Sequence, residues 1–156
     1  MIILSKLADY GVIVATSLAA FPDRQATAAA IAAETRLPRA TVAKLLKALA
    51  HAELVTATRG ALGGYRLARA AKAISIAEVV AAIDGDIGLT QCSVHVPECS
   101  RTTYCPTRPH WAAINRAVGE ALAAVTLDAM ITQAAFLPRR PALSTSPESD
   151  EPRFSA

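Results

Sequence analysis

Three cysteines lying close together are the residues of this chain best suited to chemistry. Cys92 and Cys99 are separated by six residues, and Cys99 and Cys105 by five, which is wider than the roughly two to four residues between paired ligands in ordinary zinc knuckles. Thiolates are soft ligands that suit iron-sulfur clusters, and three of them leave one coordination site for another residue. The spacing alone leaves open an iron-sulfur cluster, a zinc site completed by a histidine, and thiols that bind no metal.

Basic residues on a predicted helix form a second group of functional candidates. Pro38 suits the first turn of this helix, where its missing N–H group is not needed. Apolar residues then recur at the spacing of one buried helix face, at Val42, Leu45, Leu46 and Leu49. The residues left for the opposite face are Arg39, Ala40, Ala43, Lys44 and Lys47. Such a basic face is either simply solvated or binds phosphates.

The elements predicted around this helix favour the second alternative. Thr27 can cap a short helix that ends near Thr35, so the two helices form a predicted helix-turn-helix. The β-prone residues 54–58 and 65–67 then flank the glycine-rich stretch 59–64, an order that predicts a two-stranded hairpin, or wing. A hairpin alone could be an ordinary surface turn, but a helix-turn-helix followed by a basic wing is typical of DNA-binding proteins.

Three further helices are predicted to support this unit. The first covers residues 4–20, with one buried face made of Leu4, Leu7, Gly11, Val14 and Leu18. The second begins with a capping box at Ser75 and Glu78 and ends at Gly85. The third begins at Trp111, carries an apolar stripe of Ile114, Val118, Leu122 and Val125, and can restart at Thr126 through Phe136. We expect this last stripe to pack against a second subunit.

Composition and length bound the fold class. The chain has 156 residues, of which 53% are hydrophobic and only 4% aromatic, with many alanines, which favours closely packed helices. We therefore expect a mostly α winged helix-turn-helix protein with a long C-terminal dimerisation helix. The predicted divisions are a DNA-binding domain over 1–85, a cysteine-rich cluster-binding loop over 86–110, a dimerisation region over 111–137 and a disordered tail over 138–156.

The distribution of charge agrees with DNA binding, and the sequence also argues against a membrane protein and against an enzyme. Residues 1–75 hold ten Lys and Arg against four Asp and Glu, a net charge of +6, whereas residues 76–156 hold six against nine, a net charge of −3. No uninterrupted apolar stretch is long enough to span a membrane, so we expect a cytoplasmic protein with reduced thiols. The sequence has neither a C-x-x-C pair nor a His-Glu metal motif, and we do not expect an enzyme.

Four stretches together resemble one family of regulators. They are LSKLADYG at 4–11, RGALGGYRLA at 59–68, ISIAEVVAAIDG at 74–85 and the segment that carries the three cysteines. The combination is similar to the iron-sulfur-responsive winged-helix transcription regulators, which include IscR, the nitric-oxide sensor NsrR and the regulator of the SUF cluster-assembly system. The last group is matched best, through 4–11 and CPTRPHWAAINRAV from Cys105, and the resemblance covers about residues 1–135.

This resemblance implies a homodimer that binds a double-stranded DNA operator of approximate two-fold symmetry. The implied function is a cluster-dependent repressor of iron-sulfur assembly genes; a nitric-oxide or redox sensor of the same fold and a zinc-stabilised DNA-binding module are the alternatives. In the major groove, the implied contacts are Arg39, Thr41, Lys44 and Lys47. At the wing they are Arg59, Gly63, Gly64 and Tyr65, because missing side chains allow the backbone to approach DNA.

The resemblance also implies a 2Fe-2S or 4Fe-4S cluster on Cys92, Cys99 and Cys105. In IscR-like members, a histidine three residues after the last cysteine completes the cluster, but this chain has Arg108 there, and an arginine cannot serve. The candidates for the fourth ligand are therefore Asp9, His95 and His110. In the resembling nitric-oxide sensors, an aspartate at the place of Asp9 completes a 4Fe-4S cluster from the other subunit, and we expect the same here. The alternative is a surface aspartate that caps the helix or pairs with Lys6.

Overall fold

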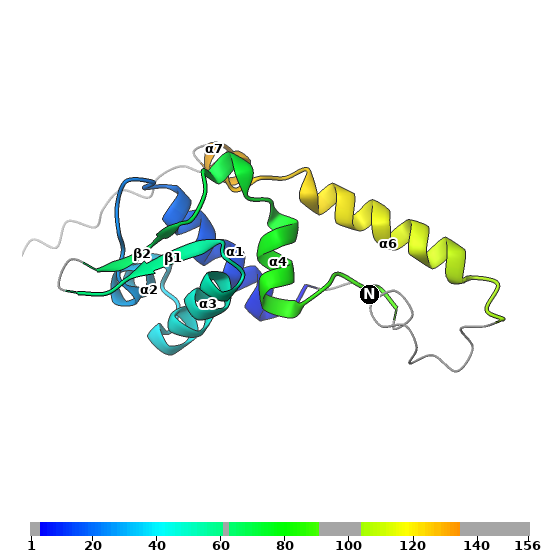
Figure 1. The fold of residues 1–156 in the computed structure, drawn as a ribbon, viewed down its shortest axis with the longest axis horizontal. Helices are drawn as coiled ribbons and strands as arrows, with labels where there is room; N and C mark the ends of the chain where they lie inside the picture. Colours follow the sequence, from blue (N-terminus) through cyan, green and yellow to red (C-terminus); the bar gives the residue numbers. More distant parts are fainter. Residues whose placement is uncertain (1–3, 61–62, 91–103, 135–156) are drawn as a thin grey trace, which may run out of the picture.

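The computed structural model describes residues 4–60, 63–90 and 104–134. In chain order the elements are α1 (Lys6–Ala19), α2 (Ala28–Thr35), α3 (Arg39–His51), β1 (Val55–Thr58), β2 (Gly64–Leu67), the 3-10 helix η1 (Ala71–Ala73), α4 (Ile76–Asp84), α6 (Arg108–Ala123) and α7 (Leu127–Ala134). The predicted mostly helical winged helix-turn-helix with a two-stranded wing is confirmed (Figure 1). Within the described ranges, no helix combines the length and apolar character needed to cross a membrane.

Side-chain caps set where three of the helices begin. The hydroxyls of Ser5, Thr27 and Ser75 each accept a hydrogen bond from the backbone N–H three residues later, at the starts of α1, α2 and α4. Glu78 completes the capping box of α4 by accepting from the Ser75 N–H at 2.8 Å, and Arg69 donates to the same carboxylate at 2.7 Å. The Arg69 hydrogen bond and those from Ser75 hold the pKa of Glu78 below its ordinary value. The caps predicted at Thr27 and Ser75 are confirmed.

The buried face of α1 differs in part from the predicted stripe. Gly11, Val14 and Leu18 are buried as predicted. The prediction is wrong at Leu4 and Leu7, whose side chains are 43% and 36% exposed. Helical spacing marks apolar residues that share a face, but it cannot tell whether the surface that covers them belongs to the same chain.

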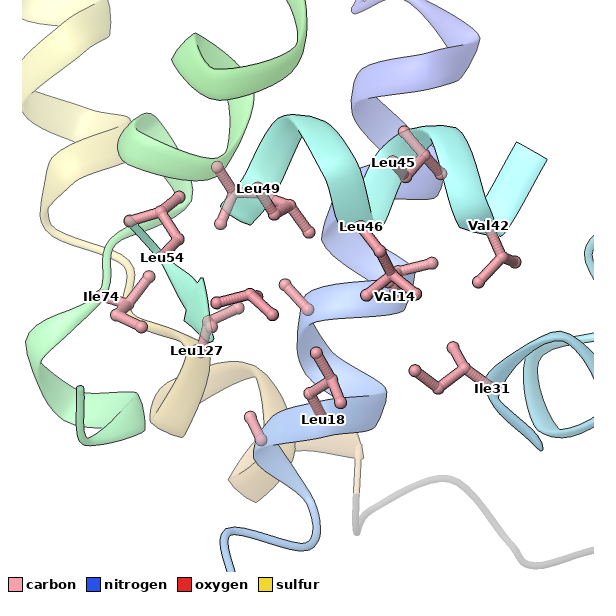
Figure 2. Packing of buried hydrophobic residues seen from close by; sticks show 14 of the residues in the cluster. Val14, Leu18, Ile31, Val42, Leu45, Leu46, Leu49, Leu54, Ile74 and Leu127 are labelled. Atoms are coloured by element: carbon pink, nitrogen blue, oxygen red, sulfur yellow. The ribbon is translucent and has the colours of Figure 1, made fainter. Parts of the chain in front are cut away.

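The core lies between α1, α3 and the elements that pack around them. α3 contributes the predicted stripe, and its members Val42, Leu45, Leu46 and Leu49 are all buried. Figure 2 shows these side chains gathered with those of Val14 and Leu18 from α1 and Ile31 from α2. α3 begins one residue after Pro38, so the proline precedes the helix instead of occupying its first turn. The turn before it is tight because Arg36 adopts a left-handed conformation, with φ 58°.

The wing is held to the rest of the domain by a single-residue bridge. β1 and β2 pair antiparallel, with Thr58 opposite Gly64. On the other side of β2, the Ala26 N–H donates to the Tyr65 carbonyl at 3.0 Å, and the Tyr65 N–H donates to the Ala26 carbonyl at 2.8 Å. A Cβ atom on Gly64 would come within 2.9 Å of the Ala26 carbonyl oxygen. This close approach therefore explains why a glycine begins β2.

α6 projects away from the body formed by α1–α4 and the wing (Figure 1), and none of its residues is buried. It begins at Arg108, three residues earlier than predicted, because Pro109 lies in the first turn, where the missing N–H costs no hydrogen bond. His110 therefore belongs to a helix, and the predicted loop over 86–110 ends before it. The side chain of Asn115 ties α6 to the segment after α4. It donates to the Ile87 carbonyl at 2.8 Å and accepts from the Leu89 N–H at 3.1 Å.

The chain returns to the core through α7. The Ile76 N–H donates to the Val125 carbonyl at 2.9 Å, and the Leu127 N–H donates to the Ile74 carbonyl at 3.0 Å. The Leu127 side chain is 0% exposed and packs in the core shown in Figure 2. The last part of the region 111–137 thus joins the core of the winged-helix unit. The predicted tail over 138–156 lies outside the described residues.

Replacing Leu127 with alanine is expected to destabilise the protein by about 2–5 kcal/mol, because the change leaves a cavity in the shared core. The matched control is Val125→Ala, two residues earlier at a side chain that is 37% exposed, which should change stability by no more than about 0.5 kcal/mol. Denaturant unfolding at one protein concentration measures both. Equal losses for the two variants would show that α7 is not part of the core.

Candidate nucleic-acid interface and cysteine segment

The exposed face of α3 carries the basic side chains singled out in the sequence. Arg39, Lys44 and Lys47 are all exposed, while Thr41 is half-buried at the edge of the face. Because the opposite face of α3 is fixed in the core, these cations project from a rigid element. Arg36, in the turn before α3, is exposed as well; helical periodicity could not identify it because it lies outside any helix.

The wing adds a second group of exposed cations. Arg59 follows β1 and is exposed. The chain then turns through Gly60, whose φ of 115° favours glycine, and the Gly63 N–H donates to the Gly60 carbonyl at 2.9 Å. Arg66 projects from β2 and donates to the Thr56 hydroxyl at 3.4 Å across the hairpin. Arg59, directly after β1, and Arg66, within β2, thus lie on either side of the glycine-rich tip in the sequence.

Three of the wing residues predicted to contact DNA also have a role in the packing of the chain itself. A Cβ atom on Gly63 would collide with the Thr58 carbonyl oxygen, and Gly64 is constrained by Ala26 as described above. Tyr65 is half-buried and packs against the core. The two glycines are therefore required by the fold of the wing itself, and contact of Gly63, Gly64 and Tyr65 with DNA stays a prediction.

Cys105 is the member of the cysteine group that lies within the described residues. Cys92 and Cys99 fall outside them, so the arrangement of the three thiols stays a prediction. Cys105 is half-buried just before α6, and its Sγ atom lies 3.2 Å from the Thr107 hydroxyl oxygen. The described residues contain no group of three or more His, Cys, Asp or Glu side chains able to hold a metal. A site made by all three cysteines includes residues within 91–103, so it stays a prediction.

The candidate fourth ligands lie on different elements. Asp9 is exposed in the first turn of α1 and, among the described residues, forms no ion pair with Lys6 or any other cation. The Lys6 ammonium instead lies 5.6 Å from the centre of the Tyr10 ring. His110 is exposed in the first turn of α6, and His95 falls outside the described residues. Asp9 thus lies on α1 and Cys105 just before α6, and no group of three or more metal-binding side chains that includes them occurs among the described residues.

The chain is similar to bacterial regulators over part of its length. It is 33% identical over 106 residues to the protein rrf2 of Nitratidesulfovibrio vulgaris, a match that covers 68% of this chain and 70% of that protein. It is 34% identical over 89 residues to the regulator IscR of Vibrio parahaemolyticus, covering 57% of this chain and 52% of that protein. Both relatives are bacterial proteins, and IscR is a helix-turn-helix transcriptional regulator.

Solved structures extend this likeness beyond the DNA-binding part of the chain. CymR, the global cysteine regulator of B. subtilis, superposes with a TM-score of 0.68 at 25% identity, covering 85% of this chain and 98% of that one. IscR of T. potens superposes with a TM-score of 0.66 at 25% identity, covering 85% and 88%. Residues 4–133 match the Rrf2 family, described as an iron-dependent transcriptional regulator. The chain therefore belongs to the Rrf2 family of DNA-binding transcription regulators and is not an enzyme.

Proposed function

We propose that this chain is a cytoplasmic, homodimeric repressor whose binding to operator DNA depends on an iron-sulfur cluster, and that it controls genes for iron-sulfur cluster assembly, as the SUF-system regulators do. The observation that carries the proposal is the three cysteines, Cys92, Cys99 and Cys105, whose positions in the sequence lie between α4 and α6. A 2Fe-2S or a 4Fe-4S cluster would satisfy this donor set.

The basic surface of α3 and the wing supports the DNA part of the proposal. Arg39, Lys44 and Lys47 project from a helix whose other face is buried, so the major groove could accept the exposed side without disturbing the core. Arg59 and Arg66 extend the positive charge onto the wing. Each such cation placed near a phosphate releases condensed counterions, which makes binding strongly dependent on salt.

The chemistry of the thiols supports the cluster part. Three soft thiolates with one open coordination position suit iron and leave a site for a weaker ligand. Cys105 lies just before α6, with its Sγ atom 3.2 Å from the Thr107 hydroxyl oxygen. Cys92, Cys99 and Cys105 would hold the cluster, which supplies iron sensitive to oxidants and nitric oxide when bound.

The position of Asp9 supports a fourth ligand from the partner subunit. Leu4 and Ser5, which precede α1, line one cavity together with Val118 and Leu122 of α6. Arg108 lies ten residues before Val118, so the rise of the helix alone places the Cys105 end of α6 about 15 Å further from this cavity. A carboxylate of the same chain is poorly placed to reach that end, whereas α1 of a second copy is not restricted in this way.

Such a ligand would connect the cluster to the DNA-binding surface. α1 packs directly against α3 and α4, so a bond to Asp9 would restrain the helix that supports α3. Losing that bond would remove this restraint on α1 and change how the two recognition helices of the dimer are spaced. A carboxylate binds iron less strongly than a thiolate does, so it is the ligand most easily lost to a signal molecule.

Lys47→Ala and Arg59→Ala are expected to weaken DNA binding and to lower the slope of log affinity against log salt by about 0.9 for each phosphate contact removed. Lys72→Ala is the matched control, because Lys72 lies on η1, which packs against α7. Binding to operator-length duplex DNA over a series of salt concentrations measures the slopes. Slopes unchanged from wild type in both variants would place the DNA on another surface.

Protein purified without oxygen is expected to be brown, and Cys105→Ala should abolish or strongly weaken the cluster because three thiolates leave no spare ligand. Asp9→Ala should accelerate loss of the cluster in air, while His110→Ala and His95→Ala should not. Absorption spectra with iron and sulfide analysis measure these effects. Colourless protein with stoichiometric zinc would contradict the proposed iron-sulfur cluster. If the cluster is perturbed only in one of the histidine variants, the fourth ligand is that histidine and not Asp9.

A further inference from the structure

Arg36 is held in a backbone conformation that is unfavourable for its residue type. It lies in the turn between α2 and α3 and adopts the left-handed helical conformation, with φ 58° and ψ 27°. A Cβ atom destabilises this conformation, whereas glycine adopts it readily. Among the described residues, Glu53 is the other non-glycine residue with a positive φ, at 57°. A glycine at position 36 would therefore make the same turn in a more stable protein.

The chain on both sides of Arg36 prevents the turn from relaxing. Just before it, the Thr35 hydroxyl donates to the Ile31 carbonyl at 2.7 Å. Just after it, Leu37 is half-buried and packs against the core. Ile31 of α2 and Val42 of α3 are 0% exposed, and Figure 2 shows both in the shared core. The backbone at Arg36 is thus fixed by its neighbours, so its side chain starts from a defined point.

The side chain of Arg36 does not contribute an ion pair to the fold. It is exposed and forms no ion pair among the described residues. The acidic residue nearest to it in the sequence is Glu34, which pairs with Arg24 at 3.1 Å. Arg24 in turn lies 4.4 Å from the centre of the Phe21 ring. The strained residue is therefore a cation whose closest acidic neighbour in the sequence is already paired.

Arg36 extends the positive surface of α3 beyond the start of the helix. It precedes Arg39, the first residue of α3, by three positions, and residues 38–40 are all exposed. The sequence contains no acidic residue between Glu34 and Glu53, so α3 and the turn before it carry positive charge alone. In helix-turn-helix proteins, the first residues of the recognition helix contact base edges. A long cation just before them lies where the phosphates border the groove.

We propose that Arg36 binds a DNA phosphate beside the major groove, and that this contact is why an arginine occupies a turn that favours glycine. The inference rests on the DNA-binding surface of the proposed function, and it adds a contact from outside both α3 and the wing. Strained residues occur where the surrounding structure holds them for a function. A phosphate contact positions the protein on the duplex and carries no sequence information.

The test measures stability and DNA binding in the same full-length variant, because the two should change in opposite directions. Arg36→Gly should raise the midpoint of thermal unfolding by about 2–4 °C, since the strain is removed. The same change should weaken binding by at least about fivefold near about 0.1 M salt and lower the salt slope by about 0.9 for each contact removed. The probes are a duplex that the protein selects from a random pool and a duplex of unrelated sequence. Both should lose affinity equally.

Two further variants separate the charge from the backbone. Glu53→Gly is the matched control, because Glu53 has the same left-handed conformation, is exposed, and lies beyond the other end of α3. It should raise the unfolding midpoint without any loss of DNA affinity. Arg36→Lys keeps a cation in the strained turn, so it should retain most of the affinity and the salt slope without the gain in midpoint.

Wild-type binding by Arg36→Gly would overturn the inference. So would an Arg36→Lys variant as weak as Arg36→Gly, because its charge is kept, or a loss confined to the selected duplex, because a phosphate contact is blind to sequence. If Lys47→Ala and Arg59→Ala lower the salt slope while Arg36→Gly does not, this inference fails alone. If none of the three variants lowers the slope, the DNA-binding surface of the proposed function fails with it.

Discussion

The junction where the chain re-enters its own core is the contact on which the rest of the architecture depends. Residues 125–127 pair with 74–76 through the hydrogen bonds from Ile76 to Val125 and from Leu127 to Ile74. This pairing buries Leu127 and fixes the near end of α6 against the winged-helix unit. Because α6 is anchored at that end and at Asn115, the remainder of the helix must extend away from the body, carrying Cys105 and Trp111 with it.

The same junction makes α6 a rigid connection between the cysteine segment and the DNA-binding unit. A cluster bound as proposed would include Cys105, which lies at the end of α6 opposite the junction. Its effect on DNA binding would then pass either along α6 into the junction or through a second copy to α1. The second route is short, because α1 packs against α3.

Most of the fold could be predicted from local patterns, because those patterns report local physics. The caps at Thr27 and Ser75, the buried stripe of α3 and the hairpin all follow from hydrogen bonds or spacing within a few residues. The Ala26 bridge could not be predicted, since a one-residue strand has no periodicity. Leu4 and Leu7 were misplaced because helical spacing marks apolar residues that share a face but does not tell how far along that face the core extends. The roles of Gly64 and Tyr65 in holding the wing likewise depend on a contact with a distant residue.

The central claim is that the cluster controls affinity for DNA, and the most direct test is to measure operator binding by cluster-loaded and cluster-free protein at one salt concentration, with both forms shown to be dimers. The account predicts that the cluster-loaded protein binds at least about tenfold more tightly, equivalent to a coupling free energy of about 1.4 kcal/mol. Equal affinities of the two forms would contradict it and would leave a DNA-binding regulator whose signal is not the cluster.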